Sequence, residues 1–213
     1  MAVIEDDIIA GNLYDKYGTS NPIAAYLMEG FKESFEYFVT KSGAKDIHEI
    51  GCGEGKLSIA MAGKGLCVRA SDFSREIIKK AEENAKQSKL EIHFRTGNIY
   101  EMIPARDSAE LIVCCEVMEH LADPRAALEI VERLAKPYFL VSVPREPLWR
   151  WMNLARFKYV SRFGNTPGHI QHWSSRAFLD FLRTRFDIIE KRLPIPWTMA
   201  LCRIRNVRQN RWS

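Results

Sequence analysis

Hydrophobic residues between positions 46 and 144 recur in two patterns that alternate along the chain. Short, almost continuous apolar runs are typical of strands that are buried on both faces of a sheet. Segments with apolar residues at helical spacing separate these runs. The runs lie at 46–51, 66–71, 90–96, 109–116 and 138–144, and the helical segments lie at 55–64, 74–88 and 123–135. This alternation predicts an α/β fold with a doubly wound, mostly parallel sheet.

The flanking segments extend the prediction to seven strands. Residues 21–43 have the amphipathic pattern of a helix, with Pro22 near its start and Gly43 after its end. After Pro144 the alternation stops, so residues 145–173 are read as an insertion. The closing elements are a helix at 174–185 and strands at 186–193 and 198–204. The prolines of "LPIPW" suit a hairpin between these strands, which predicts an antiparallel last strand.

Composition narrows the class of protein. A chain of 213 residues with 46% hydrophobic and 27% charged residues is typical of one globular domain. No apolar run approaches the roughly 20 residues of a membrane span, and the acidic N-terminus is unlike a signal peptide. The five cysteines lack C-x-x-C spacing, which disfavours a cysteine zinc site and predicts reduced thiols in a cytoplasmic protein.

A glycine-rich turn follows the first of the alternating strands. The stretch "HEIGCGEG" places Gly51, Gly53 and Gly55 where, in this architecture, ligands bind beyond the carboxyl ends of the strands. The spacing is G-x-G-x-G, and Lys56 stands where a dinucleotide fingerprint needs its third glycine. Glu49, just upstream, suits a cationic ligand better than a pyrophosphate. A nicotinamide oxidoreductase is therefore disfavoured.

The stretch "EIGCGEG" resembles the first motif of class I S-adenosylmethionine-dependent methyltransferases, which have a Rossmann-like fold. The resemblance implies that Gly51, Cys52 and Gly53 lie against the amino-acid part of the cofactor. It also implies that Glu49 holds the ammonium group, directly or through water. In "VRASDFS", it implies that Asp72 accepts both ribose hydroxyls and that Phe73 lies against the adenine.

Three further stretches continue the resemblance. "RTGNIYE" matches the adenine-edge motif and makes Asn98 and Ile99 cofactor contacts, although the family usually has Asp where Asn98 stands. "LIVCCEVMEHLADP" matches the fourth-strand motif, so the Cys115–Glu116 backbone is expected to border the cofactor. "NLYDKYGTSNP" is similar to an N-terminal lid in which Tyr14 and Tyr17 contact the cofactor; alternatively both tyrosines only pack.

On this basis the single domain has four parts. They are an N-terminal lid and helix (1–43), a cofactor-binding core (44–144), an acceptor-side insertion (145–173), and a closing helix with the last strands (174–213).

An acidic–histidine cluster is expected on the acceptor side. In "EVMEH", Glu116, Glu119 and His120 stand at i, i+3 and i+4, and "GHIQHWS" adds His169 and His172. All five are candidate catalytic residues. The E-x-x-E-H segment is similar to that of the small-RNA 2′-O-methyltransferases, which hold magnesium with it and a later histidine, and to that of the ubiquinone-biosynthesis O-methyltransferases. The resemblance implies a metal set of Glu116, Glu119, His120 and His169. In the alternative, Glu119 caps or pairs with a neighbour and His120 orients the substrate without metal.

The insertion bears on the acceptor. Its apolar positions at helical spacing are Leu148, Trp151, Met152, Ala155 and Tyr159, and five basic residues lie between 145 and 162. The segment is either a lid on the core, the wall of a pocket for a hydrophobic or aromatic acceptor, or a surface that rests on an anionic membrane or nucleic acid.

The predicted function is methyl transfer to a small hydrophobic or aromatic acceptor at oxygen, because a neutral hydroxyl needs a base or a metal to react. RNA 2′-O-methylation, N- or S-methylation, and cofactor binding without catalysis are the alternatives. Nucleic acid is the weaker choice because the chain carries no added RNA-binding module.

Overall fold

The computed structural model describes residues 3–5, 8–10, 21–157 and 159–205. Seven strands form one sheet in the order β5-β4-β3-β6-β7-β9-β8. They are β3 (Asp46–Ile50), β4 (Cys67–Asp72), β5 (His93–Thr96), β6 (Ala109–Cys115), β7 (Ala135–Pro144), β8 (Phe186–Arg192) and β9 (Trp197–Ile204). The short strands β1 (Val3–Glu5) and β2 (Ile8–Ala10) form a separate antiparallel pair.

The strand directions confirm the predicted fold. Strands β3 to β7 are parallel, whereas β9 runs antiparallel to both β7 and β8. The β8–β9 connection contains Pro194 and Pro196, so the chain turns back and β9 enters the sheet between β7 and β8. The sheet is thus doubly wound about β3, and the carboxyl ends of its five parallel strands meet at one edge.

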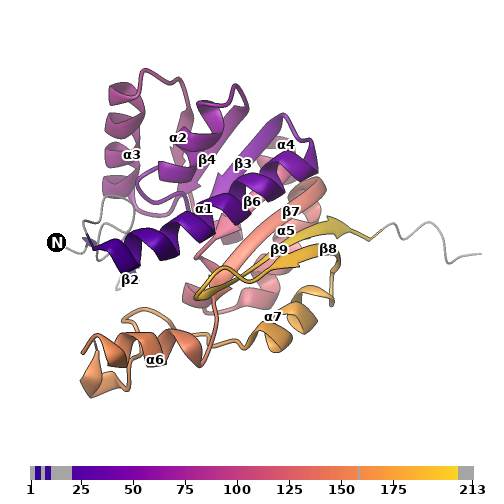
Figure 1. Ribbon diagram of the computed structural model, residues 1–213. Helices are drawn as coiled ribbons and strands as arrows, with labels where there is room; N and C mark the ends of the chain where they lie inside the picture. The colour runs from indigo at the N-terminus through magenta and orange to yellow at the C-terminus, as the bar shows by residue number, and fades with distance from the viewer. Residues whose placement is uncertain (1–2, 6–7, 11–20, 158, 206–213) are drawn as a thin grey trace, which may run out of the picture.

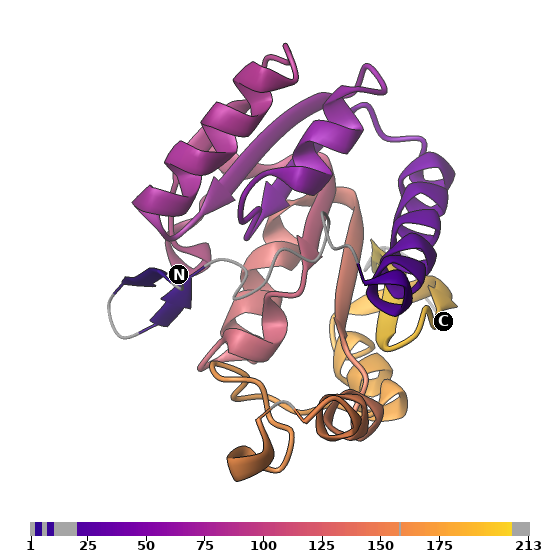
Figure 2. The same ribbon diagram turned by 60° about the vertical axis from the view of Figure 1, so that its left-hand side comes forward.

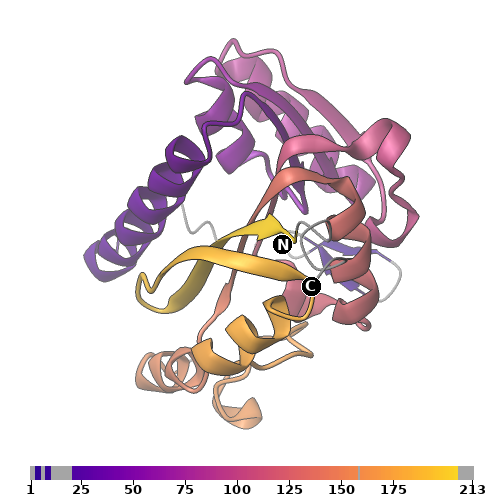
Figure 3. The ribbon, with the colours of Figure 1, turned by 90° about the vertical axis from the view of Figure 1, so that its right-hand side faces the viewer.

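Helices cover both faces of the sheet (Figure 1; Figure 3 shows the β8–β9 edge). One face carries α1 (Pro22–Ser42), α2 (Lys56–Ala62) and α3 (Arg75–Gln87), and the other carries α5 (Pro124–Leu134) and α7 (Ser175–Leu182). Two cores result: Phe31 and Phe38 of α1 are buried on the first face, and Leu134 and Phe178 are buried on the second. Each core is a continuous apolar layer between helices and strands.

Helix starts follow the local sequence. The side chain of Asn21 accepts from the Ile23 and Ala24 N–H groups, and Asp123 accepts from those of Arg125 and Ala126. The Ser74 hydroxyl likewise accepts from the Ile77 N–H and begins α3. These bonds satisfy N–H groups that a helix leaves without a partner in its first turn.

The insertion differs from the expected helical stripe. Helix α6 (Leu148–Ala155) ends four residues before Tyr159, and Trp151 is 66% exposed. Trp149, which the stripe left out, packs on the core instead. The predicted stripe is therefore wrong, because the side of α6 that meets the protein carries Trp149 and the buried Asn153. Figure 2 shows α6 and the turns after it beyond the carboxyl end of β7.

Two further observations concern membrane-spanning helices and the cysteines. Within the part of the chain that the structure describes, helices are too short or too polar to cross a membrane. All five cysteines are free, and Cys67 is exposed whereas the other four are buried.

Candidate active site

The glycine turn after β3 has the left-handed backbone that glycine permits. Gly51 and Gly53 have φ values of 75° and 53°. A Cβ atom on Gly51 would collide with Cγ2 of Val117, so this glycine lets the turn pack against the segment after β6. A Cβ on Gly53 would meet no atom of the described residues within 4 Å. The turn therefore leaves open space beside Gly53 at the carboxyl edge of the sheet.

The N–H groups of this turn bond within the protein. Those of Gly51 and Cys52 donate to the Ser71 carbonyl oxygen at 2.7 and 3.0 Å, and that of Gly53 donates to Asp72 Oδ2 at 2.9 Å. Gly55 N–H donates to the Cys52 carbonyl. A pyrophosphate site requires such donors to point at the ligand. The turn is therefore built for a group that packs against main chain, not for a phosphate.

Two buried carboxyl groups lie beside the turn. Asp72 is 7% exposed, and its Oδ1 accepts from the Ser74 N–H at 3.1 Å. A carboxylate has about four acceptor positions, so it can accept from hydroxyl groups as well as from backbone N–H groups. Glu49 is 2% exposed and accepts a hydrogen bond from the Ser58 hydroxyl. Burial, and to a smaller extent the Asp72 charge, raises the pKa of Glu49 to about 8, against the effect of the Ser58 bonds.

The other expected cofactor residues fall into two groups. Phe73 is half-buried and Asn98 is exposed, and Asn98 Oδ1 caps the short turn η1 (Ile99–Glu101) by accepting from the Tyr100 N–H. The side chains of Cys52, Ile99 and Cys115 are instead buried in the cores, so only their backbones can border the crevice. Tyr14 and Tyr17 lie outside the described residues.

The strand β6 ends in an unusual backbone conformation. Glu116 has a φ of 60°, which is uncommon for a residue other than glycine, and its N–H donates to the Ser142 carbonyl at 3.1 Å. Such a conformation is found where surrounding structure enforces it, often at functional sites. Here the turn directs the chain from β6 into η2 (Met118–His120).

Three candidate residues come together beyond this turn. Glu119, His120 and His169 each offer a ligand atom, and these atoms all lie within 4.8 Å of one another. The rings of His120 and His169 meet edge to face, with their centroids 4.9 Å apart. His120 Nδ1 bonds the Gly168 carbonyl at 2.9 Å, which requires Nδ1 to carry a proton and makes Nε2 the basic nitrogen of the neutral ring. Glu116, although predicted for the same set, lies outside this group.

The insertion holds His169 in place. Trp149 stacks on the His169 ring, and its Nε1 donates to Thr166 Oγ1 at 2.9 Å. Asn153 Nδ2 donates to the Gly164 carbonyl at 2.9 Å, while the N–H of Ile170 donates to the Glu119 carbonyl. Helix α6 and η2 therefore fix the loop 164–170 from both sides. Sequence reasoning missed Trp149, because its role depends on a loop 20 residues later.

His172 lies in a different environment. Its Nδ1 is 3.8 Å from a Glu146 carboxylate oxygen, and Arg150 Nε is 3.7 Å from the same oxygen. Burial, and then the Arg150 charge, lowers the pKa of His172, whereas burial raises the pKa of Glu146. Of the two predicted histidines of the insertion, the structure brings His169 to Glu119 and His120, and it places His172 beside Glu146.

Comparison with known families identifies the fold and its chemistry. Residues 41–176, more than half of the chain, match the family described as a methyltransferase domain. The chain belongs to this family. The prediction of a class I S-adenosylmethionine-dependent methyltransferase is thereby confirmed.

Individual relatives agree with this assignment. This methyltransferase is 30% identical over 125 residues to the ubiquinone biosynthesis O-methyltransferase of Xanthomonas oryzae pv. oryzae (strain PXO99A), over 57% of this chain and 52% of the relative. It is 27% identical over 161 residues to the protein of that name from Xanthomonas euvesicatoria pv. vesicatoria (strain 85-10), over 72% of this chain and 65% of the relative. The chain thus spans about half the length of the first of these relatives.

A solved structure shares the fold. The magnesium protoporphyrin IX methyltransferase of Synechocystis PCC 6803 with bound SAH aligns with a TM-score of 0.68 at 17% identity. The alignment covers 88% of this chain and 90% of that chain. At this identity the likeness concerns the arrangement of the elements.

Three features at the carboxyl edge of the sheet fit S-adenosylmethionine. A group can pack against the main chain beside Gly53, and the Asp72 carboxylate next to this turn is a group that accepts hydrogen bonds from ribose hydroxyls. Glu49 is a buried carboxyl group that an ammonium ion would stabilise in its charged form. The three features lie along the turns that end β3 and β4.

Proposed function

We propose that this methyltransferase transfers the methyl group of S-adenosylmethionine to an oxygen of a small hydrophobic acceptor. The observation that carries the proposal is the group of Glu119, His120 and His169 beyond β6, at the same edge of the sheet as Gly53 and Asp72. A base beside an electrophilic methyl group is what a neutral hydroxyl needs in order to react. The O-methyltransferase names of the relatives support the same assignment.

The chain's own residues align the reactants and move a proton. When bound, S-adenosylmethionine supplies a methyl group on a positively charged sulfur, which is already activated for transfer. Asp72 and Glu49 bind and orient its two ends, and the Glu116 turn borders the space between crevice and acceptor. Nε2 of His120 accepts the hydroxyl proton, and the buried Glu119 stabilises the imidazolium that forms.

The same group of side chains supports a divalent cation in place of a simple base. One carboxylate and two imidazoles suit an ion that accepts nitrogen ligands, such as Mn²⁺, better than Mg²⁺, which prefers oxygen ligands. Glu119, His120 and His169 would hold it, and a bound cation would lower the pKa of the acceptor hydroxyl. If so, EDTA abolishes methyl transfer and Mn²⁺ or Mg²⁺ restores it; full activity in EDTA would leave His120 as the base.

The insertion supports a hydrophobic acceptor. Its exposed apolar side chains are Trp151, Phe157, Val160, Phe163 and Ile170, at 54–89% exposure. Arg156 and Arg162 are exposed among them. Such a surface favours contact with an apolar molecule or with the anionic membrane that carries it.

A methyl-transfer assay tests the proposed function. The chain is incubated with labelled S-adenosylmethionine and, separately, with a hydrophobic phenol series, an amine series, a thiol series and total RNA. Label in the phenol products supports the proposal. Label in RNA, with affinity that falls steeply as salt rises, would replace it with nucleic-acid methylation. Binding of S-adenosylhomocysteine without transfer to any pool would indicate a non-catalytic protein.

A further inference from the structure

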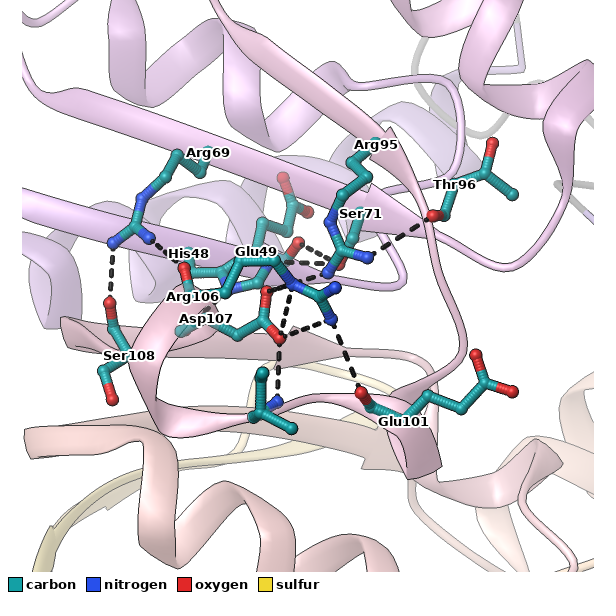
Figure 4. A network of polar contacts seen from close by, with 11 residues as sticks. His48, Glu49, Arg69, Ser71, Arg95, Thr96, Glu101, Arg106, Asp107 and Ser108 are labelled. Atoms are coloured by element: carbon teal, nitrogen blue, oxygen red, sulfur yellow. Dashed lines mark hydrogen bonds and ion pairs between the residues drawn. The ribbon is translucent and has the colours of Figure 1, made fainter.

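A polar network links β3, β4 and β5 to the segment before β6, and the mechanism above does not use it (Figure 4). Its members His48, Ser71 and Asp107 are buried, and its arginines are partly exposed. Its central residue is Asp107, at the end of the short helix α4 (Pro104–Asp107). The side chain of Asp107 is 2% exposed. The other members are His48, Arg69, Ser71, Arg95 and Arg106. They come from β3, β4, β5 and α4, so the network crosses the half of the sheet that holds the cofactor.

The first branch of the network reaches the glycine turn. His48 Nδ1 donates to the Asp107 carbonyl at 2.8 Å, so Nε2 of the neutral ring accepts from the Ser71 hydroxyl at 3.0 Å. Burial lowers the pKa of His48, which favours this neutral ring. The Ser71 carbonyl in turn holds the N–H groups of Gly51 and Cys52. His48 therefore supports the residue on which the glycine turn rests, one position before Asp72.

The second branch reaches the loop that carries Asn98. Arg95 donates to Asp107 Oδ1 at 2.8 Å, and its guanidinium fills the space beside Gly97, where a Cβ would lie 2.6 Å from its nitrogen. The Ile103 N–H donates to Asp107 Oδ2 at 2.9 Å. Asp107 thus holds both ends of the loop 97–103, whose Gly97 N–H also donates to the Asp72 carbonyl at 2.8 Å.

Asp107 is well suited to hold these parts rigidly. Burial alone would raise its pKa, but hydrogen bonds from Arg106 and the Ile103 N–H, with the charges of Arg95 and Arg106, lower the pKa of Asp107 overall. It is therefore a charged acceptor of several hydrogen bonds, and charge-assisted bonds of this kind are stronger and shorter than neutral ones. Among the described residues, its partners are His48, Arg95, Ile103 and Arg106, which are separate from the group of Glu119, His120 and His169.

We propose that His48 and Asp107 are positioning residues that hold the glycine turn, Asp72 and the loop 97–103 in the arrangement that binds the nucleoside half of the cofactor. This inference rests on the proposed cofactor. It predicts that the network controls affinity for adenosine-containing ligands and not the methyl-transfer step.

The test is calorimetric binding of two probes to the full chain. S-adenosylhomocysteine carries both halves of the cofactor, and 5′-methylthioadenosine lacks the amino-acid half. Asp107→Asn is expected to lower the affinity for both probes by the same factor, at least tenfold. Glu49→Gln is expected to lower the affinity for S-adenosylhomocysteine alone. His48→Gln keeps one donor and one acceptor, so its affinity for both probes is expected to lie between those of the wild type and His48→Leu. These two His48 variants test the inference if Asp107→Asn does not fold.

Phe186→Leu is the control for a purely structural role, because Phe186 is fully buried in β8, at the opposite edge of the sheet. It should lower the melting temperature but change both affinities by less than twofold. Equal loss of affinity in Phe186→Leu and in the network variants, or no loss in the latter, would overturn the inference alone. A wild-type chain that binds neither probe would overturn the proposed function and this inference with it.

Discussion

The turns that follow β3, β4 and β5 are short and have main-chain N–H groups as their main donors, whereas the segment after β7 is long and adds side-chain donors to its backbone hydrogen bonds. The Ser71 and Asp72 carbonyls and the Asp72 carboxylate fix the first region, with donors from Gly51, Gly53 and Gly97. Residues 145–173 combine backbone bonds, such as that of Ile170 to Glu119, with side-chain contacts such as that of Trp149 with Thr166. Both regions meet at one edge of the same sheet.

This difference matches two different tasks. A cofactor of fixed shape can be bound by a backbone arrangement, which a few side chains such as Asp72, His48 and Asp107 hold in place. The proposed acceptor contacts are side chains of the insertion, where Phe157 and Phe163 are more than 80% exposed. Mutations in the two regions should therefore separate: the first should change cofactor affinity, and the second should change turnover.

His120→Ala should have the largest effect on turnover. His120 lies in η2 and bonds the Gly168 carbonyl of the insertion, so this variant tests the insertion's side of the comparison. Removal of a proton acceptor is expected to lower kcat by about 10²–10⁴-fold. S-adenosylhomocysteine affinity should stay within twofold, since the proposed role of His120 is toward the acceptor and not the cofactor. Single-turnover kinetics and calorimetry measure the two quantities. The exposed His93→Ala on β5 is the control, and parallel losses of turnover and affinity in His120→Ala would place His120 on the wrong side.

Asp72→Ala should have the opposite profile. Loss of the carboxylate removes the expected ribose acceptor and leaves the Gly53 and Ser74 N–H groups without their partner. S-adenosylhomocysteine binding should weaken by about 3 kcal/mol, or roughly a hundredfold. The control is Asp187→Ala, at an exposed position of β8, which should leave the affinity for S-adenosylhomocysteine unchanged. Unchanged calorimetric affinity in Asp72→Ala would contradict the assignment of this residue.

A matched pair of glycines tests whether the space beside Gly53 belongs to the cofactor. Gly53 and Gly43 both have positive φ values, 53° and 67°, and a Cβ on either meets no described atom within 4 Å. Alanine at either position should therefore cost a similar ~1–2 kcal/mol of stability from backbone strain. Only Gly53→Ala should also weaken S-adenosylhomocysteine binding, by tenfold or more. Equal affinities in the two variants would mean that nothing occupies this space.

A smaller effect is expected in the pH dependence of S-adenosylhomocysteine binding, because Glu49 should lose its proton when the ligand binds. With a pKa of about 8, Glu49 keeps its proton at pH 7 in the free protein, and an ammonium ion bound beside it favours the carboxylate. S-adenosylhomocysteine binding should therefore release up to one proton at pH 7, and fewer as the pH rises above 8. Calorimetry in buffers of different ionisation enthalpy measures this number.

The same pKa predicts the sign of a stability change. Between about pH 4.5, the ordinary value for Glu, and pH 8, the folded protein holds a proton that the unfolded chain has lost. The free energy of unfolding should therefore fall as pH rises through this window, by a few kcal/mol, relative to Glu49→Gln. Identical pH profiles of the two proteins in denaturant titrations would show that the Glu49 pKa is not raised.

Local pattern alone determined much of this protein. Alternating apolar runs predicted the five parallel strands, and the closing segments predicted the other two. The helices predicted from residues 74 and 123 begin there because Ser74 and Asp123 bond N–H groups two or three residues away. The glycine turn and Asp72 were recognisable because parallel strands bring their ends to one edge, so position along the chain implies position in space.

Other features depended on contacts between residues far apart in sequence. Gly51 is required by Val117, which lies 66 positions later, and the conformation of Glu116 depends on a bond to Ser142. The resemblance already placed His169 and not His172 in the metal set, but only the packing of the loop against Trp149 and Glu119 explains why His169 reaches His120. Helical periodicity placed Trp151 in the apolar stripe, but in the structure Trp151 is exposed and Trp149 packs against the core. Only the tertiary structure could decide these points, because periodicity describes one element whereas burial depends on which elements meet.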